Sequence, residues 1–309
     1  MFQGMHYVYE VYKEMSFSKA ARNLCISQPS LSAAVKKAEA QIGFPIFDRS
    51  SNHIQLTELG KEYIRSIEII MDVENGFQNY INDMKELKSG TIAIGGTNLF
   101  ASYVLPPLLS RFTEQYPQVQ VNLVEATTSQ LTDRLFSGSL DLLIDNKSMD
   151  PAIYQKSFFC EEQLLRAVPI CLSVNEKMKN YALTASDIRE NRHLNSRIPP
   201  VPLENFQEES FLTLKSGNDT RTRADRICHN AHVIPKIKLE LDQQITAYTL
   251  SRYGMGISFC SDTLVRHVPD DEGLVYYKLN HQDALREVNF YYKRNRYMPR
   301  SVSTFLDMI

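Results

Sequence analysis

Apolar side chains near the start of the chain recur at the three- and four-residue spacing of an amphipathic helix. The first such pattern contains Tyr7, Val8, Val11 and Tyr12, and we expect it to form a helix with one buried face. Ser16 or Ser18 then supplies a helix start, so a second helix is predicted over 18–24. A tight turn at 25–27 separates it from a third helical pattern over 28–41.

The third helix is predicted to bury one face and to expose a polar one. Ser27 is a suitable N-cap, and Pro29 falls in the first turn, where its missing N–H costs little. The apolar face consists of Leu31, Ala34, Val35, Ala38 and Ile42. The opposite face offers Gln28, Ser30, Ser32, Ala33, Lys36 and Lys37. Glutamine and serine can hydrogen-bond base edges and lysine suits phosphates, although a merely solvated face is the alternative.

Two short alternating runs follow the third helix, at 45–49 and 54–57, on either side of the polar turn 50–53. We expect them to pair as two strands. Three helices and such a pair have the layout of a winged helix-turn-helix, whose second motif helix enters the DNA major groove. The wing would direct Arg49 and His53 toward the DNA backbone or minor groove.

This segment resembles the N-terminal domain of LysR-type transcriptional regulators. The motifs that carry the resemblance are Ser16-Phe17-Ser18-Lys19-Ala20-Ala21-Arg22-Asn23-Leu24, then Ser27-Gln28-Pro29-Ser30-Leu31-Ser32, Glu39 with Gly43, Phe47 and Arg49, and Leu56-Thr57-Glu58-Leu59-Gly60. The resemblance implies that Gln28, Pro29 and Ser32 approach bases and that Ser18, Lys36 and Arg49 meet phosphates. Ala33 and Ala34 depart from the basic or amide side chains of many members, and the wing is less basic than usual. Base contacts are therefore expected to be weaker, with more reliance on dimer geometry and DNA shape.

A long helix is predicted over 58–88, because this stretch has no proline and only two glycines. Tyr63, Ile70, Phe77 and Met84 recur every seven residues, with Ile67 and Ile81 at the complementary position. The spacing indicates a short coiled coil, interrupted at Glu74. In the family this helix pairs two subunits; a helix packed only on its own domain is the alternative.

From residue 90 onward the pattern alternates between strands and helices, which predicts an α/β domain with a largely parallel sheet. Strands are predicted at 91–95, 119–125, 140–144, 162–168, 236–241, 256–260, 274–279 and 287–293, and helices at 100–116, 243–252 and 301–309. Two crossovers, near 161 and 266, would divide the domain into two subdomains with a cleft between them. The predicted organisation is a winged helix-turn-helix domain (1–58), a linker helix (59–89) and an effector domain (90–309). Within the last, subdomain I comprises 90–160 and 267–309, and subdomain II comprises 161–266.

This body resembles the LysR effector domain, which is built like a type 2 periplasmic binding protein. The residues that carry the resemblance are Ile94-Gly95, Leu105-Pro106, Phe112, Tyr116-Pro117, Gly138, Leu140-Asp141 and Gly254-Met255-Gly256-Ile257. Cys260 departs from it, because proline commonly follows the Gly-Ile strand.

Candidate effector-binding residues lie in loops at the carboxyl ends of predicted strands, near helix N-termini whose free N–H groups attract anions. The candidate loops are 95–98, 127–129 and 217–221, the last of which precedes a helix. In the family, the residues after Gly95 line the effector cleft. We expect Thr97, Asn98, Thr128 and Ser129 to hydrogen-bond the effector, with Arg197 a further candidate as the partner of an effector carboxylate. The alternative is that these residues only build turns and caps.

Charge and composition support a regulator that meets DNA at one end. Residues 1–57 carry a net charge of +2, and because the whole chain carries −2, the remainder carries −4. A locally basic head on an acidic body suits phosphate contact at that head alone. No apolar run approaches the roughly 18 residues that cross a bilayer, and the first residues lack the features of a secretory signal. We therefore expect a cytoplasmic protein without membrane association.

Catalytic and metal-binding motifs are not expected. The chain has no Gly-x-Ser-x-Gly, His-Glu-x-x-His, Gly-x-x-x-x-Gly-Lys or Gly-x-Gly-x-x-Gly sequence, so enzyme, metal and cofactor functions are not predicted. Five scattered cysteines indicate reduced thiols; Cys228, between Arg226 and His229, is the one alternative candidate for a redox-sensitive thiol. His229 and His232 lie next to it without a motif that completes a metal site.

The sequence thus predicts a sequence-specific DNA-binding transcriptional regulator controlled by a small-molecule effector. Expected partners are double-stranded DNA, the effector, further copies of the chain arranged as a dimer of dimers, and RNA polymerase. A solute-binding protein without a DNA function is the alternative, because the body resembles one.

Overall fold

The structure, a computed structural model, describes residues 2–48, 54–84, 90–269 and 272–309. The chain forms two compact units. The first comprises residues 1–87 with the short segments 133–140 and 295–300, and the second contains the rest. No helix among the described residues is both long enough and apolar enough to span a membrane.

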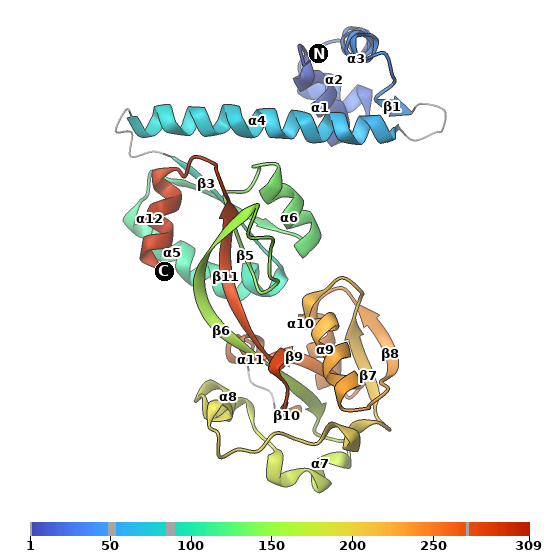
Figure 1. Cartoon of the computed structure of the whole chain (residues 1–309), viewed down its shortest axis with the longest axis vertical. Helices are drawn as coiled ribbons and strands as arrows, with labels where there is room; N and C mark the ends of the chain where they lie inside the picture. Colours follow the sequence, from blue (N-terminus) through green and yellow to red (C-terminus); the bar gives the residue numbers. More distant parts are fainter. Residues whose placement is uncertain (1, 49–53, 85–89, 270–271) are drawn as a thin grey trace. The chain divides into compact units, whose positions relative to one another are not determined.

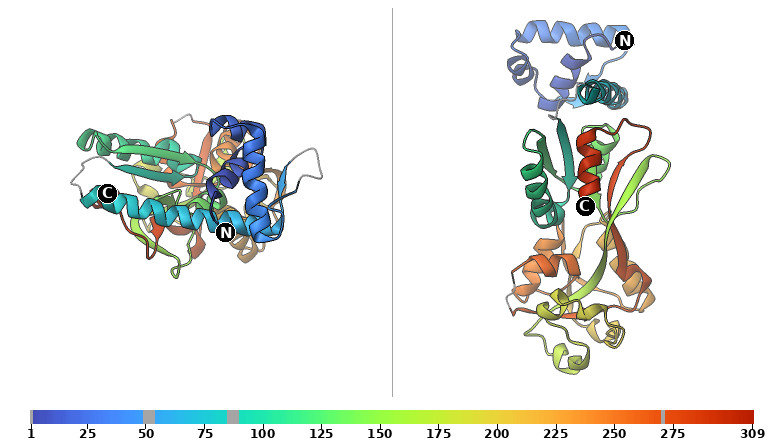
Figure 2. Two further views of the ribbon diagram at one scale, coloured as in Figure 1. Left: turned by 90° about the horizontal axis from the view of Figure 1, so that it is seen from above. Right: turned by 90° about the vertical axis from the view of Figure 1, so that its left-hand side faces the viewer.

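The N-terminal head contains three helices and a two-stranded wing, followed by a long helix. Their bounds are α1 (Met5–Glu14), α2 (Phe17–Asn23), α3 (Gln28–Ile42), β1 (Phe47–Asp48), β2 (Gln55–Leu56) and α4 (Glu58–Met84). Strands β1 and β2 are antiparallel, with Phe47 opposite Leu56. Figure 2 shows α4 as one uninterrupted helix. The predicted helix-turn-helix and wing are therefore present.

Local hydrogen bonds explain where the helices of the head begin and end. The Ser16 side chain accepts from the Lys19 N–H, and the Ser27 side chain accepts from the Ser30 N–H, which satisfies one free donor at each helix start. Between the two helices, Cys25 adopts a left-handed backbone with φ of 54°. Gly43 ends α3 in the same conformation, with φ of 84°, where a residue without Cβ has no steric cost.

The first half of the predicted coiled-coil seam packs inside the head rather than against a partner. Tyr63 and Ile67 are 6% and 0% exposed and belong to the same core as Val8, Leu31 and Val35. A heptad pattern cannot by itself distinguish a helix's own core from a partner, which explains the difference. The Met84 side chain lies outside the described residues.

The body contains one mixed sheet that runs through two lobes. In Figure 1 the long strands β6 (Tyr154–Pro169) and β11 (Leu285–Lys293) connect the lobes as an antiparallel pair. In the first lobe β3 (Thr91–Gly96) lies between β4 (Gln120–Glu125) and β5 (Leu142–Asp145), all parallel. In the second lobe the sheet order is β6, β9 (Ile257–Ser261), β7 (Ser210–Leu214) and β8 (Lys236–Leu241), while β10 (Leu274–Lys278) pairs with the end of β6.

Helices cover both lobes of this sheet. They are α5 (Leu105–Gln115), α6 (Thr128–Phe136), α7 (Val174–Lys177), α8 (Ala185–Arg189), α9 (Asp219–Asn230), α10 (Gln244–Arg252), α11 (Asp262–His267) and α12 (Arg300–Met308). Short 3-10 turns lie at Lys179–Tyr181, Arg192–Leu194, Leu203–Phe206 and Gln282–Ala284. The predicted helix over 100–116 begins as a π-helix at Phe100–Val104, where the Leu105 N–H donates to the Phe100 carbonyl. Pro106 and Pro107 supply no N–H for an ordinary α-helical ladder at this point, which explains the departure.

The second predicted crossover is displaced in the structure. The sequence placed it near residue 266, but Leu274–Lys278 pairs with 165–169 and therefore still belongs to the second lobe. The chain returns through β11, because among the strands that the structure describes only β11 pairs both with β6 and with β5 of the first lobe. The first crossover lies within β6, which extends further toward the N-terminus than the predicted 162–168.

Candidate functional site

One face of α3 presents the polar side chains that the sequence singled out. Gln28, Pro29, Ser30, Ala33, Lys36 and Lys37 are exposed, and Ser32 is half-buried. Leu31, Val35 and Ala38 on the opposite face are buried. The 15-residue helix is about 22 Å long at 1.5 Å per residue, which is sufficient to cross a major groove.

Hydrogen bonds hold the start of α3 in place. The Ser18 hydroxyl donates to the Gln28 side-chain oxygen over 2.9 Å, which leaves the Gln28 amide NH₂ directed elsewhere. The Glu39 carboxylate accepts from the Ile46 and Phe47 N–H groups at 2.9 and 3.2 Å and so ties the wing to α3. Arg49 and His53, the predicted wing contacts, lie outside the described residues.

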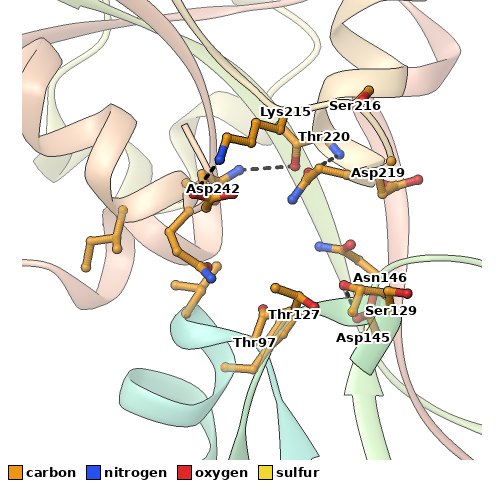
Figure 3. A pocket seen from close by; sticks show the side chains of 18 of the residues that line it. Thr97, Thr127, Ser129, Asp145, Asn146, Lys215, Ser216, Asp219, Thr220 and Asp242 are labelled. Atoms are coloured by element: carbon orange, nitrogen blue, oxygen red, sulfur yellow. Dashed lines mark hydrogen bonds and ion pairs between the residues drawn. The ribbon is translucent and has the colours of Figure 1, made fainter. Parts of the chain in front are cut away.

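A polar cavity of about 310 Å³ lies between the two lobes of the body. The loops after β3, β4 and β5 line one side, and the N-terminal turns of α9 and α10 line the other. Figure 3 shows Thr97, Thr127, Ser129 and Asp145 on the first side and Lys215 and Thr220 on the second. Ligands of open α/β sheets bind at such carboxyl ends of strands.

The structure brings three of the five predicted effector residues to this cavity. Thr97, Thr128 and Ser129 line it. Asn98 does not line it, and its amide donates to the Glu125 carboxylate over 2.9 Å. Arg197 is exposed, does not line the cavity, and donates its backbone N–H to the Asn195 side chain. The effector roles of all five stay predictions.

Several charged residues of the cavity were not predicted. They are Asp145, Lys215, Asp242 and Arg286, whereas Asp219 belongs to the predicted loop 217–221. Asp145 ends a predicted strand, so the strand-end rule that pointed to Thr97 could have found it. Arg286 carried no such signal, because its neighbours come from segments more than 60 residues away along the chain.

Arg286 is the centre of a buried ion-pair network behind the cavity. Its Nε donates to the Glu162 carboxylate over 2.6 Å and one terminal nitrogen donates to Asp219 over 3.0 Å. The Arg286 and Glu162 side chains are 1% and 0% exposed. Burial alone would lower the pKa of Arg286, but Glu162 and Asp219 reverse that effect and raise it. The guanidinium therefore joins β11, β6 and the start of α9 as a fixed cation.

Asp262 and Cys228 are two further titratable groups of the body that do not line the cavity. Asp262 accepts from His193 at 3.0 Å and from Arg266 at 2.9 Å. Burial would raise the pKa of Asp262, but these bonds hold it below its usual value. Cys228 is 2% exposed and burial raises its pKa, which opposes the thiolate that a redox-sensitive cysteine requires. Among the residues that the structure describes, no three histidine, cysteine or acidic side chains are arranged to hold a metal ion.

A winged helix-turn-helix head and a two-lobed α/β body with a polar cavity define a ligand-responsive DNA-binding regulator. Residues 2–61 match the family described as bacterial regulatory helix-turn-helix protein, lysR family, and residues 85–170 and 190–309 match the LysR substrate binding domain. The chain therefore belongs to the LysR family of transcriptional regulators.

Individual relatives agree with this membership. The uncharacterized HTH-type transcriptional regulator YcgK of Bacillus subtilis (strain 168) is 28% identical over 98% of this chain and 92% of its own length. A probable RuBisCO transcriptional regulator of Gracilaria tenuistipitata var. liui is 24% identical, with coverages of 96% and 91%.

Solved structures share the fold over the whole chain. A full-length OxyR variant from Pseudomonas aeruginosa superposes with a TM-score of 0.70 at 20% identity, covering 100% of this chain and 94% of that one. Full-length CbnR in complex with its target DNA gives 0.64 at 16% identity, with coverages of 100% and 98%. The domain order of head, long helix and two-lobed body is thus common to these proteins.

Proposed function

We propose that this regulator reads specific DNA sites through the exposed face of α3 and changes its DNA binding when a small molecule occupies the cavity of the body. The observation that carries the proposal is the capped, core-anchored α3 with Gln28, Ser30 and Lys36 on its exposed face. The proposal includes no catalytic step, metal or cofactor. It places the protein with its DNA in the bacterial cytoplasm, where RNA polymerase is the expected further partner.

We expect Lys36→Ala and Gln28→Ala to affect DNA binding differently. Fluorescence anisotropy would compare the intergenic DNA beside the protein's own gene with a scrambled duplex of equal length. Lys36→Ala removes one phosphate contact, so it should weaken binding to both duplexes alike and reduce the slope of log affinity against log salt by about 1. Gln28→Ala removes a base contact, so it should weaken binding to the intergenic DNA selectively, by about 1–3 kcal/mol.

Lys177→Ala is the matched control, because it removes one exposed positive charge from α7 of the body. Equal effects of Lys36→Ala and Lys177→Ala on affinity and salt slope would contradict the assignment of α3. If the wild-type chain fails to distinguish the two duplexes, sequence-specific binding at this site is excluded.

We also propose that α4 pairs two copies of the chain, and that such dimers associate further into tetramers. Three apolar side chains remain exposed at four-residue spacing on this helix: Ile69 is 40%, Val73 69% and Phe77 65% exposed. They form a stripe on one face, distinct from the buried Tyr63 and Ile67. An exposed apolar stripe of this kind is typical of a protein interface.

Phe77→Glu is expected to convert the dimer into a monomer in sedimentation velocity at micromolar concentration, because a buried unpaired carboxylate is costly. Asn75→Glu is the control. Asn75 is exposed and lies two residues after Val73, which places it on another face of the helix. Dimerisation that survives Phe77→Glu and fails in Asn75→Glu would place the interface elsewhere.

A further inference from the structure

We propose that the effector of this chain carries a positively charged amino, amidino or guanidino group, which binds to the carboxylate of Asp145. The inference rests on the proposed effector function and specifies the chemistry of the ligand. The sites for the rest of the molecule are the hydroxyl groups of Thr97, Thr127 and Ser129, which surround the same side of the cavity (Figure 3).

Asp145 is a buried carboxylate at the end of β5 that faces the cavity. The residue is 2% exposed and lines the cavity. Its Oδ2 accepts from the Thr128 hydroxyl at 2.9 Å and its Oδ1 accepts from the Lys147 backbone N–H at 2.7 Å. A carboxylate has about four acceptor positions, so these two bonds leave capacity for a donor that comes from the cavity.

No cation of the described structure pairs with Asp145. Among the cavity residues only Lys215 and Arg286 are basic. Lys215 donates to Asp242 over 2.9 Å, and Arg286 is held by Glu162 and Asp219. Burial raises the pKa of Asp145, while the Thr128 and Lys147 bonds and the charge of Arg286 offset this only in part.

The charges of the cavity lining therefore favour a cationic ligand. Three carboxylates, Asp145, Asp219 and Asp242, face two cations that are already paired. An anionic ligand would enter a negatively charged space without a free cation, at a large desolvation cost. An ammonium or amidinium group would form a charge-assisted hydrogen bond with Asp145, and such bonds are the stronger kind in a partly buried site.

The experiment compares paired probes that differ in charge: putrescine against adipate, and benzamidine against benzoate. Binding to the full-length chain is measured by isothermal titration calorimetry, with thermal melting as a second readout. Putrescine or benzamidine is expected to bind, with adipate and benzoate inactive. Asp145→Asn is expected to weaken binding of the cationic probe about tenfold or more, because it removes one hydrogen bond between charged groups.

Asp145→Asn should still fold, because an amide oxygen can accept from the Lys147 N–H and a neutral group avoids the cost of a buried charge. Glu176→Gln is the control, since it removes one exposed negative charge from α7 and should leave probe binding unchanged.

Several results would overturn the inference: binding of the carboxylates but not the cations, equal binding of the cations by wild type and Asp145→Asn, or binding of none of the four probes. DNA binding without probes is measured on the same samples. If the chain binds its DNA site but binds the carboxylate probes, the proposed function stands and only this inference fails. Failure to bind DNA counts against the proposed function itself.

Discussion

Arg286→Met is expected to lower the free energy of unfolding by about 3–5 kcal/mol, because it leaves the buried Glu162 carboxylate without its cation, whereas Asp219 keeps its bond from Arg223 at 2.7 Å. Glu162 is fully buried and Asp219 is 16% exposed. Urea unfolding followed by circular dichroism would measure the change, since the chain has no tryptophan for fluorescence.

The same substitution at a second buried arginine, Arg166, is not expected to lower the free energy of unfolding. Arg166 is fully buried, but its guanidinium lies over the rings of Phe206, Phe211 and Phe259 at 5.2, 4.8 and 4.6 Å. Its Nε and one terminal nitrogen have no hydrogen-bond partner, and burial lowers its pKa to about 10. Arg166→Met removes an unpaired buried charge and keeps contact with the rings, so stability should be unchanged or higher.

The pair of substitutions separates the charge network from side-chain packing. If both variants lose several kcal/mol, the loss of packing volume dominates and the ion-pair account of Arg286 is wrong. If only Arg166→Met is strongly destabilised, the three rings bind the guanidinium more favourably than the unpaired nitrogens oppose it.

Gly60→Ala is expected to unfold the head, with a cost of about 3 kcal/mol or more. An added Cβ would lie 2.1 Å from the Ile46 carbonyl oxygen, which is backbone and cannot move away alone. That carbonyl is also held by the Thr57 N–H, and the Gly60 N–H donates to the Thr57 hydroxyl. Hydrogen exchange in peptides from residues 2–48 should accelerate, and specific DNA binding should disappear.

Gly43→Ala provides the matched comparison within the same head. An added Cβ there meets no atom within 4 Å, but φ is +84°. Only the left-handed backbone is then penalised, by about 1–2 kcal/mol. Exchange protection that falls equally in both variants would show that close packing at Gly60 is not what fixes the wing against α4.

The head could be predicted from the sequence almost completely because its signals are local. Helix caps such as Ser16 and Ser27, and the spacing of Leu31 and Val35, act within a few residues. The coiled-coil prediction for α4 was only half right for a physical reason. Tyr63 and Ile67 satisfy a heptad spacing equally well in the head's own core and in a partner's groove.

The cavity was less predictable because long-range contacts build it. Thr97, Thr128 and Ser129 follow strands that alternation alone reveals. Arg286 and Glu162, by contrast, lie 124 residues apart and meet only because β11 pairs with β6. The strand β10 was predicted at the right residues but assigned to the wrong lobe for the same reason, since a short apolar run does not reveal which lobe its partner strand belongs to.

The most direct test of the account is selection of DNA by the full-length chain from sheared genomic fragments, followed by sequencing of the retained pieces. Two copies that present α3 as a pair predict a small set of fragments sharing two related half-sites, spaced by about 10.5 base pairs or a multiple of it. Gly60→Ala should retain none of these fragments, while Glu176→Gln should retain the same set. Retained DNA with no shared sequence, or the same DNA retained by Gly60→Ala, would contradict the claim that this chain is a regulator that reads DNA through α3.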